Sequence, residues 1–307
     1  MAKGTWHRGL LAAACVVGLT CCRSAQAQED GLVFDPARGV YTIEYVDDSG
    51  VNRVMDIIPP NRVEPTVEAT SITNSGDILE YRYTIANGAG PFVDQDLRRI
   101  ELGCAAGIET ESLVKPVPWN AEARVSAFTE RAVCDYRLRL VDEGISPGTS
   151  GSGFGVDTRF LPSVVPVAVW GLQDDIEYYP GIYDVRPELG DLVSTVNGMD
   201  GGWFETEAVG PAIAPEDLAD PTVGIAYLLS SLGDACDLGW LDDATGVCHS
   251  LEVKLQQAQA SIQADRPSAR NQIQAFLNEL EAQRGQHVNE NAYWLLKVNA
   301  QYVLSTV

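Results

Sequence analysis

Three amphipathic segments near the C-terminus constrain the fold of this chain more than any other feature of the sequence. In the first segment, apolar residues recur at spacings of four, three and four, at Leu251, Leu255, Ala258 and Ile262. That spacing places them on one stripe of an α-helix. Similar stripes surround Phe276 in the second segment and continue to Val303 in the third. Because no single helix can bury such a stripe alone, the pattern predicts a small antiparallel helical bundle.

Residues that start and end helices separate these segments. Pro267 suits the first turn of the second helix, where the N–H that proline lacks has no helical partner anyway. Gly285 is a typical C-terminal cap of that helix, and Asn289 is suited to cap the third one. Asp220-Pro221 is an equivalent start signal for an earlier helix. We therefore predict a linker at residues 216–220 and a helical domain over residues 216–307.

The order of residues in this region is distinctive, with the segments LEVKLQQAQASIQ, NQIQAFLNELEAQRGQHV and NAYWLLKVNAQYVL. Together they resemble the FIMAH-type helical domain found at the C-termini of secreted bacterial proteins, over residues 221–307. The match is best at Leu251, Leu255, Ala258, Phe276, Leu277, Ala282, Gln283, Arg284 and Gly285. The chain departs from the family pattern in a cysteine-bounded loop from Cys236 to Cys248, which affects how the first helix docks. The resemblance implies an accessory module that is appended to other extracellular domains and has no defined chemistry of its own.

Upstream of the helices, over residues 33–209, the period of the apolar pattern changes from 3.6 to 2, which is typical of strands. Between Ile78 and Ala86, apolar residues alternate with charged or polar ones, so one face suits a core and the other faces water. Asp47 to Gly50 is a hairpin signal between two apolar runs. Strands at this spacing, without helices between them, predict an all-β, immunoglobulin-like antiparallel sandwich over residues 28–215.

The first 27 residues have the layout of a secretory signal peptide. Lys3 and Arg8 precede a short apolar run, and Ala25-Gln26-Ala27 follows as a cleavage motif. Cleavage after Ala27 predicts a secreted or periplasmic protein. The alternative is a lipoprotein signal, with a lipid anchor on Cys22. No later segment of the sequence reaches the length of a membrane span.

Four cysteines follow the predicted cleavage site. An even number in an exported chain indicates two disulfides, although four cysteines permit three pairings. Nearness in the sequence and placement in the same domain favour Cys104–Cys134 and Cys236–Cys248. A zinc site is not indicated, since there is no C-x-x-C pair among them.

The chain is strongly acidic, with a formal net charge of −22 at pH 7. Such a surface repels phosphate backbones and anionic lipids, so nucleic acid and membrane surfaces are not expected as partners. We expect no cofactor and no metal, with weak calcium binding as the alternative. Four aspartates lie in and just before the loop from Cys236 to Cys248, but without the alternating ligand spacing of an EF-hand loop. They are Asp234, Asp237, Asp242 and Asp243.

The sequence lacks the usual signatures of nucleophilic catalysis. Only His249 and His287 follow the predicted cleavage site, both fall in the helical region, and there is no G-x-S-x-G motif. Glu205 and Glu207 lie beside aromatic residues, as glycoside hydrolysis requires, but this spacing on a strand is equally typical of a solvated face. We therefore predict a protein that is not an enzyme, with a polysaccharide hydrolase as the alternative.

Five aromatic residues in and near the irregular stretch that begins at residue 173 are the best candidates for a contact surface. Trp and Tyr are enriched at binding hot spots, and their rings can stack on sugars. The alternative is that they close one end of the sandwich or pack against the bundle. We predict an extracellular partner, either a protein or a glycan, with self-association through sheet edges as a further alternative. The five residues are Tyr178, Tyr179, Tyr183, Trp203 and Phe204.

Overall fold

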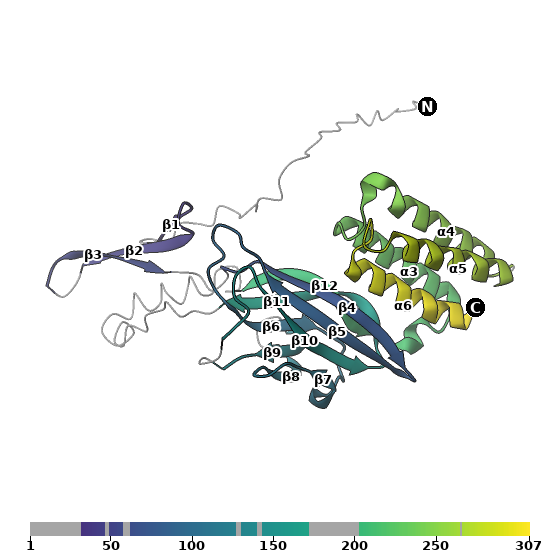
Figure 1. Ribbon diagram of the computed structural model, residues 1–307, viewed down its shortest axis with the longest axis horizontal. Coiled ribbons are helices and arrows are strands. Elements are labelled where there is room, and N and C mark those ends of the chain that lie inside the picture. The colour runs from purple at the N-terminus through teal and green to yellow at the C-terminus, as the bar shows by residue number, and fades with distance from the viewer. Residues whose placement is uncertain are drawn as a thin grey trace, which may run out of the picture.

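The structure is a computed structural model that describes residues 32–46, 49–57, 62–126, 130–139, 143–171, 203–264 and 266–307. Within these ranges the chain forms a small N-terminal sheet, two larger antiparallel sheets and four C-terminal α-helices (Figure 1). The predicted signal peptide, with Cys22, lies outside the described residues.

The small sheet has the strand order β1-β2-β3. Its strands are β1 (Leu32–Asp35), β2 (Val40–Val46) and β3 (Asn52–Ile57). Strands β2 and β3 pair antiparallel, which confirms the hairpin expected at residues 47–50. In Figure 1 this sheet lies at the end of the sandwich away from the helices.

The first large sheet has the order β4-β5-β10-β7. Its strands are β4 (Pro65–Ser75), β5 (Ile78–Asn87), β10 (Ser150–Thr158) and β7 (Leu113–Val114). The alternation expected in β5 is confirmed, because every second side chain there is buried: Leu79, Tyr81, Tyr83 and Ile85. These side chains form one wall of the core.

The second large sheet has the order β12-β11-β6-β9-β8. Its strands are β12 (Phe204–Ile213), β11 (Leu161–Gly171), β6 (Leu97–Gly103), β9 (Ala132–Arg137) and β8 (Asn120–Val125). All its neighbouring strands are antiparallel. Tyr136 of β9 donates a hydrogen bond of 2.6 Å to the carbonyl of Gly155 in β10, so the two sheets face each other.

The strand order in the two sheets is that of an immunoglobulin-like sandwich. In such folds the strands A-B-E-D of one sheet face G-F-C of the other. Here β4, β5, β10 and β7 take the places of A, B, E and D, and β12, β11 and β6 those of G, F and C. Between the sheets, the ring of Phe154 meets those of Trp119 and Tyr136 edge-on, at 4.9 and 5.6 Å. The predicted antiparallel sandwich is therefore confirmed.

The four cysteines after the predicted cleavage site form two disulfides in the structure. Cys104–Cys134, with its Cα atoms 6.0 Å apart, joins the end of β6 to β9, and Cys236–Cys248, at 6.2 Å, joins the first two helices. Strands β6 and β9 are neighbours in one sheet, so the first disulfide does not cross the sandwich. Disulfides of this kind are typical of oxidising compartments outside the cytoplasm.

The helices are α3 (Pro221–Asp237), α4 (Val247–Ser261), α5 (Arg266–Gln283) and α6 (Glu290–Thr306). Two expected N-caps are confirmed: Asp220 accepts a hydrogen bond from the N–H of Thr222, and Asn289 accepts one from that of Ala292. Gly285, after α5, has a φ of +72°, which glycine adopts without strain. No helix in the described part of the chain is both long and apolar enough to cross a membrane.

Helix α6 packs against the edge of the sandwich, and the carboxamide of Asn291 fixes the contact. Its Oδ1 accepts a hydrogen bond of 2.9 Å from the N–H of Ala69, and its Nδ2 donates one of 3.0 Å to the carbonyl of Val67. These two backbone groups belong to β4, which is an edge strand. If another strand ran parallel to β4 at this edge, one of its residues would form hydrogen bonds with the same N–H and carbonyl groups. Asn291 is only 5% exposed, and its carboxamide thus covers part of the sheet edge at β4.

The residues just before α3 pack against the helices. The linker expected at residues 216–220 overlaps the short 3-10 helix η3 (Pro215–Leu218), in which Leu218 is buried. Tyr302 of α6 donates a hydrogen bond of 2.5 Å to the carbonyl of Pro215. Asn299, from the same helix, donates one of 2.8 Å to the carbonyl of Pro162 in β11. The helices and the sandwich therefore share one continuous apolar core.

Candidate functional site

The outer face of the five-stranded sheet carries a row of aromatic and basic side chains beside a row of acidic ones. Alternate residues of a strand point to opposite faces, and Val167, Val169 and Leu102 point into the core. The residues between them therefore face outward. Cross-strand register aligns Trp170 with Arg99, and it aligns four carboxylate residues of β12, β6, β9 and β8 in one row: Glu205, Glu101, Asp135 and Glu122.

Two indoles form the aromatic part of this face. The ring centroids of Trp170, near the end of β11, and Trp203, just before β12, are 5.5 Å apart, with 45° between the ring planes. Both side chains are half-buried. The guanidinium of Arg99 lies 4.9 Å from the centre of the Trp170 ring, as in a cation–π contact. The indole N–H of Trp203 donates a hydrogen bond of 3.0 Å to Glu205. We call Trp170, Trp203, Arg99 and Glu205 the tryptophan surface.

Arg99 is held in place by two carboxylates that are almost fully buried, Glu101 and Asp135, with side chains 1% and 0% exposed. Its guanidinium donates to Glu101 at 2.8 Å and to Asp135 at 3.1 and 3.2 Å. Arg124 bonds to the same two carboxylates from the other side, and Ser126 donates a hydrogen bond of 2.7 Å to Glu101. Two guanidiniums thus balance two carboxylates, as burial of such charges requires.

The electrostatics of Arg124 agree with this arrangement. Burial lowers the pKa of its guanidinium, but the hydrogen bond to Asp135 and the charges of Asp135 and Glu101 outweigh that effect, so the pKa is raised overall. A guanidinium with two or more charge-assisted hydrogen bonds has few alternative rotamers. The network therefore holds Arg99, and with it the cation–π contact to Trp170, in one geometry.

The structure places two of the five predicted aromatic residues. Trp203 belongs to the tryptophan surface, whereas Phe204, the next residue, is partly buried against the core on the opposite face of the sheet. Tyr178, Tyr179 and Tyr183 lie outside the described residues.

Sequence reasoning missed Trp170 and Arg99, although a signal for the tryptophan was present. In the segment VVPVAVW, the core-facing valines alternate with other residues, so Trp170 falls on the outer face. No local pattern could have shown that Arg99 lies beside it, because that requires the pairing of β6 with β11.

The two carboxylates weighed for glycoside hydrolysis, Glu205 and Glu207, are both exposed and lie on the outer face of β12. Glu205 accepts the hydrogen bond from Trp203. Of the two histidines, His249 is largely exposed near Glu252, and His287 Nδ1 lies 3.2 Å from Asp242 Oδ2. Neither histidine belongs to the tryptophan surface.

Among the aspartates near Cys236 and Cys248, Asp242 has a local role. Asp242 caps a 3-10 turn, where it accepts a hydrogen bond of 3.1 Å from the N–H of Ala244. In the part of the chain that the structure describes, no group of three or more His, Cys, Asp or Glu side chains is arranged to hold a metal ion.

Part of the chain is similar to a known protein family, and part is similar to a solved structure. The family model described as the FIMAH domain matches residues 225–305, from the first turns of α3 to the end of α6. No curated protein matches the chain. Among solved structures, an uncharacterized protein from Nocardia farcinica, whose structure reveals an immunoglobulin-like fold, is similar at 14% identity and a TM-score of 0.25. The match covers 34% of this chain and 75% of that one. Residues 225–305 are therefore a FIMAH domain, which follows an antiparallel β region with immunoglobulin-like strand order.

Proposed function

We propose that this protein is a non-enzymatic recognition protein that acts outside the cytoplasm and binds a glycan through the tryptophan surface. The observation that carries the proposal is the pair of tilted indoles, Trp170 and Trp203, on the outer face of the second sheet. Aromatic rings provide a flat apolar face for the C–H groups of a sugar, and tryptophan offers the largest one.

Polar groups beside the indoles supply what a sugar also needs. Glu205, beside Trp203, offers a carboxylate acceptor, and the guanidinium of Arg99 places a positive charge beside Trp170. A sugar hydroxyl can donate a hydrogen bond to such a carboxylate. The buried network of Glu101, Asp135 and Arg124 lowers the cost of binding, since Arg99 is ordered beforehand.

A glycan array tests the proposal. The intact protein is expected to bind a subset of glycans, and Trp170→Ala and Trp203→Ala are each expected to abolish that binding without lowering the melting temperature markedly. Phe92→Ala is the matched control, because Phe92 is an aromatic residue that is 41% exposed and belongs to the loop before β6, not to the tryptophan surface. A blank array, or variants that bind as the parent does, would refute the proposal.

The non-enzymatic part of the proposal has its own test. Incubation of the protein with each bound glycan is expected to release no reducing sugar. Release that is lost in Glu205→Gln or Glu207→Gln, while binding remains, would show instead that the protein is a hydrolase.

A further inference from the structure

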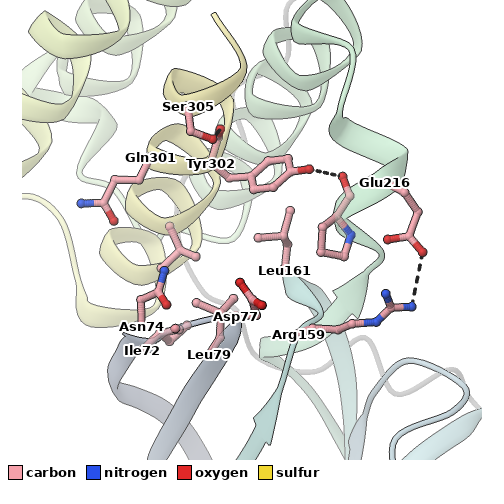
Figure 2. A pocket seen from close by; sticks show the side chains of 13 residues that line it. Ile72, Asn74, Asp77, Leu79, Arg159, Leu161, Glu216, Gln301, Tyr302 and Ser305 are labelled. Carbon is pink, nitrogen blue, oxygen red and sulfur yellow. Dashed lines mark hydrogen bonds and ion pairs between the residues drawn. The ribbon is translucent and has the colours of Figure 1, made fainter.

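A cavity lies where the helices meet the sandwich, and none of its lining residues belongs to the tryptophan surface (Figure 2). Its volume is about 560 Å³, within the usual range of ligand sites. The β4–β5 hairpin forms one wall, the start of β11 and η3 form another, and the last turns of α6 form the third. We call this cavity the junction cleft.

The walls of the junction cleft are fixed relative to one another. Tyr302 of α6 bonds to the carbonyl of Pro215, and Arg159, just before β11, forms an ion pair of 3.4 Å with Glu216 of η3 (Figure 2). Asn299 ties α6 to β11 close by. The cleft is thus formed before any ligand arrives, which favours binding because little ordering remains to be done.

The floor of the junction cleft is aliphatic. Its side chains come from both sheets and from α6, and all four are buried: Ile72, Leu79, Leu161 and Val298. Such a floor offers no hydrogen-bonding groups, so burial of a sugar hydroxyl against it would be costly. It suits an apolar side chain instead.

The rim of the junction cleft is polar. Asn74 and Asp77 come from the β4–β5 hairpin, and Gln301 from α6. Figure 2 shows the Asp77 carboxylate directed toward the middle of the cleft. Among the described residues, the side chains of Asn74, Asp77 and Gln301 have no hydrogen-bond or ion-pair partner, whereas Arg159 is already paired. A carboxamide both donates and accepts, as a peptide backbone requires, and a carboxylate attracts a cation.

From this combination we infer that the junction cleft binds a short peptide segment that carries an apolar side chain next to a Lys or Arg. The apolar side chain lies on the aliphatic floor, Asn74 and Gln301 bond to the peptide backbone, and Asp77 pairs with the cation. The net charge of −22 further favours a basic partner over an acidic one. This inference does not depend on glycan binding, since the two sites share no residue.

A peptide array tests the inference with the full chain. Peptides with an apolar residue beside a basic one are expected to bind, and replacement of the basic residue by Glu is expected to remove binding. Asp77→Lys is expected to weaken the best peptide at least about tenfold, as loss of a charge-assisted hydrogen bond implies. Asp243→Lys, an equal charge change at an exposed site outside the cleft, should leave the affinity unchanged.

Three results would overturn the inference: an array without bound peptides, equal affinity in the parent and Asp77→Lys, or equal loss in both lysine variants. The last would mean that only the overall charge matters. The two sites are separable, because Trp203→Ala should retain peptide binding and Asp77→Lys should retain glycan binding. Failure of one proposal therefore leaves the other intact.

Discussion

At the scale of single residues, the buried charges beside the tryptophan surface are stable only while each carboxylate keeps its arginine partners. Asp135 has a fully buried side chain and is the shared partner of Arg99 and Arg124. Removal of one member of a buried ion group leaves the remaining charges without compensation. The network therefore has two roles. Its loss would lower the stability of the fold, and it would also release Arg99 from its position beside Trp170.

Asp135→Asn is therefore expected to lower the free energy of unfolding by about 3 kcal/mol, measured by chemical denaturation. Glu122→Gln is the matched control on the neighbouring strand, because Glu122 pairs with Arg137 where both side chains are about half exposed. That change should cost less than about 1 kcal/mol. Equal costs for the two variants would contradict the role given to the buried network.

A second residue-scale effect concerns Glu68, at the contact between β4 and α6. Burial, and then the charge of Glu290, raise the pKa of the Glu68 carboxyl. The charge of Glu290 is partly balanced by Arg284, which bonds to it at 2.6 Å. A carboxyl with a raised pKa in the folded state favours folding most in its protonated form. Its contribution is therefore complete below the unfolded pKa and is lost as the pH rises through the folded one.

Glu68→Gln is accordingly expected to raise the free energy of unfolding near neutral pH relative to the parent, and to leave it nearly unchanged in acid. Denaturation from about pH 4 to about pH 8 measures the difference between the two proteins. Gln257→Ala, at an exposed position on α4, is the control, because it changes no titratable group and should not change the pH dependence. A constant difference across that range would show that Glu68 does not titrate as described.

At the scale of elements, the contact between α6 and β4 decides how the FIMAH domain sits on the sandwich. The carboxamide of Asn291 takes the place that a parallel strand would take at the edge of β4. An unprotected edge is a template for pairing with another chain. The helix therefore both attaches the domain and covers part of an edge.

Asn291→Ala should accelerate hydrogen exchange of the Ala69 amide, because that N–H loses its acceptor, and should cost about 1–3 kcal/mol of stability. Hydrogen exchange followed by NMR gives the first quantity, and chemical denaturation gives the second. Asn278→Ala, at an exposed site on α5, is the control. Unchanged protection at Ala69 would contradict the edge contact.

The elements differ in how far the sequence could predict them, and the reason is the range of the contacts involved. The helix starts at Asp220 and Asn289 depend on hydrogen bonds to backbone N–H groups two or three residues away, so local sequence patterns were sufficient to predict them. The contact between Ala69 and Asn291 spans 222 positions, and nothing in either segment alone points to the other. The same holds for Arg99 beside Trp170. The sequence could therefore indicate Trp203, Glu205 and the outward position of Trp170, but it could not show that Arg99 lies beside them.

At the scale of the whole molecule, the two proposed recognition sites lie on a scaffold that is tied together by disulfides and by α6. The tryptophan surface belongs to the second sheet alone, whereas the junction cleft exists only because the FIMAH domain packs on the sandwich. The fold class was predictable because the apolar period changes along the chain. The packing of η3 against α6 was not predictable, because the sequence of residues 216–220 is typical of a linker.

The central claim is that the tryptophan surface is the glycan site, and NMR of the tryptophan indoles tests it most directly. In a titration of the isotope-labelled protein with a glycan from the array, the indole signals of Trp170 and Trp203 should shift together and saturate at one affinity. Those of Trp119, Trp240 and Trp294, which lie in the core or the helical region, should stay in place. Shifts confined to these three residues, or no shifts at all, would contradict the account.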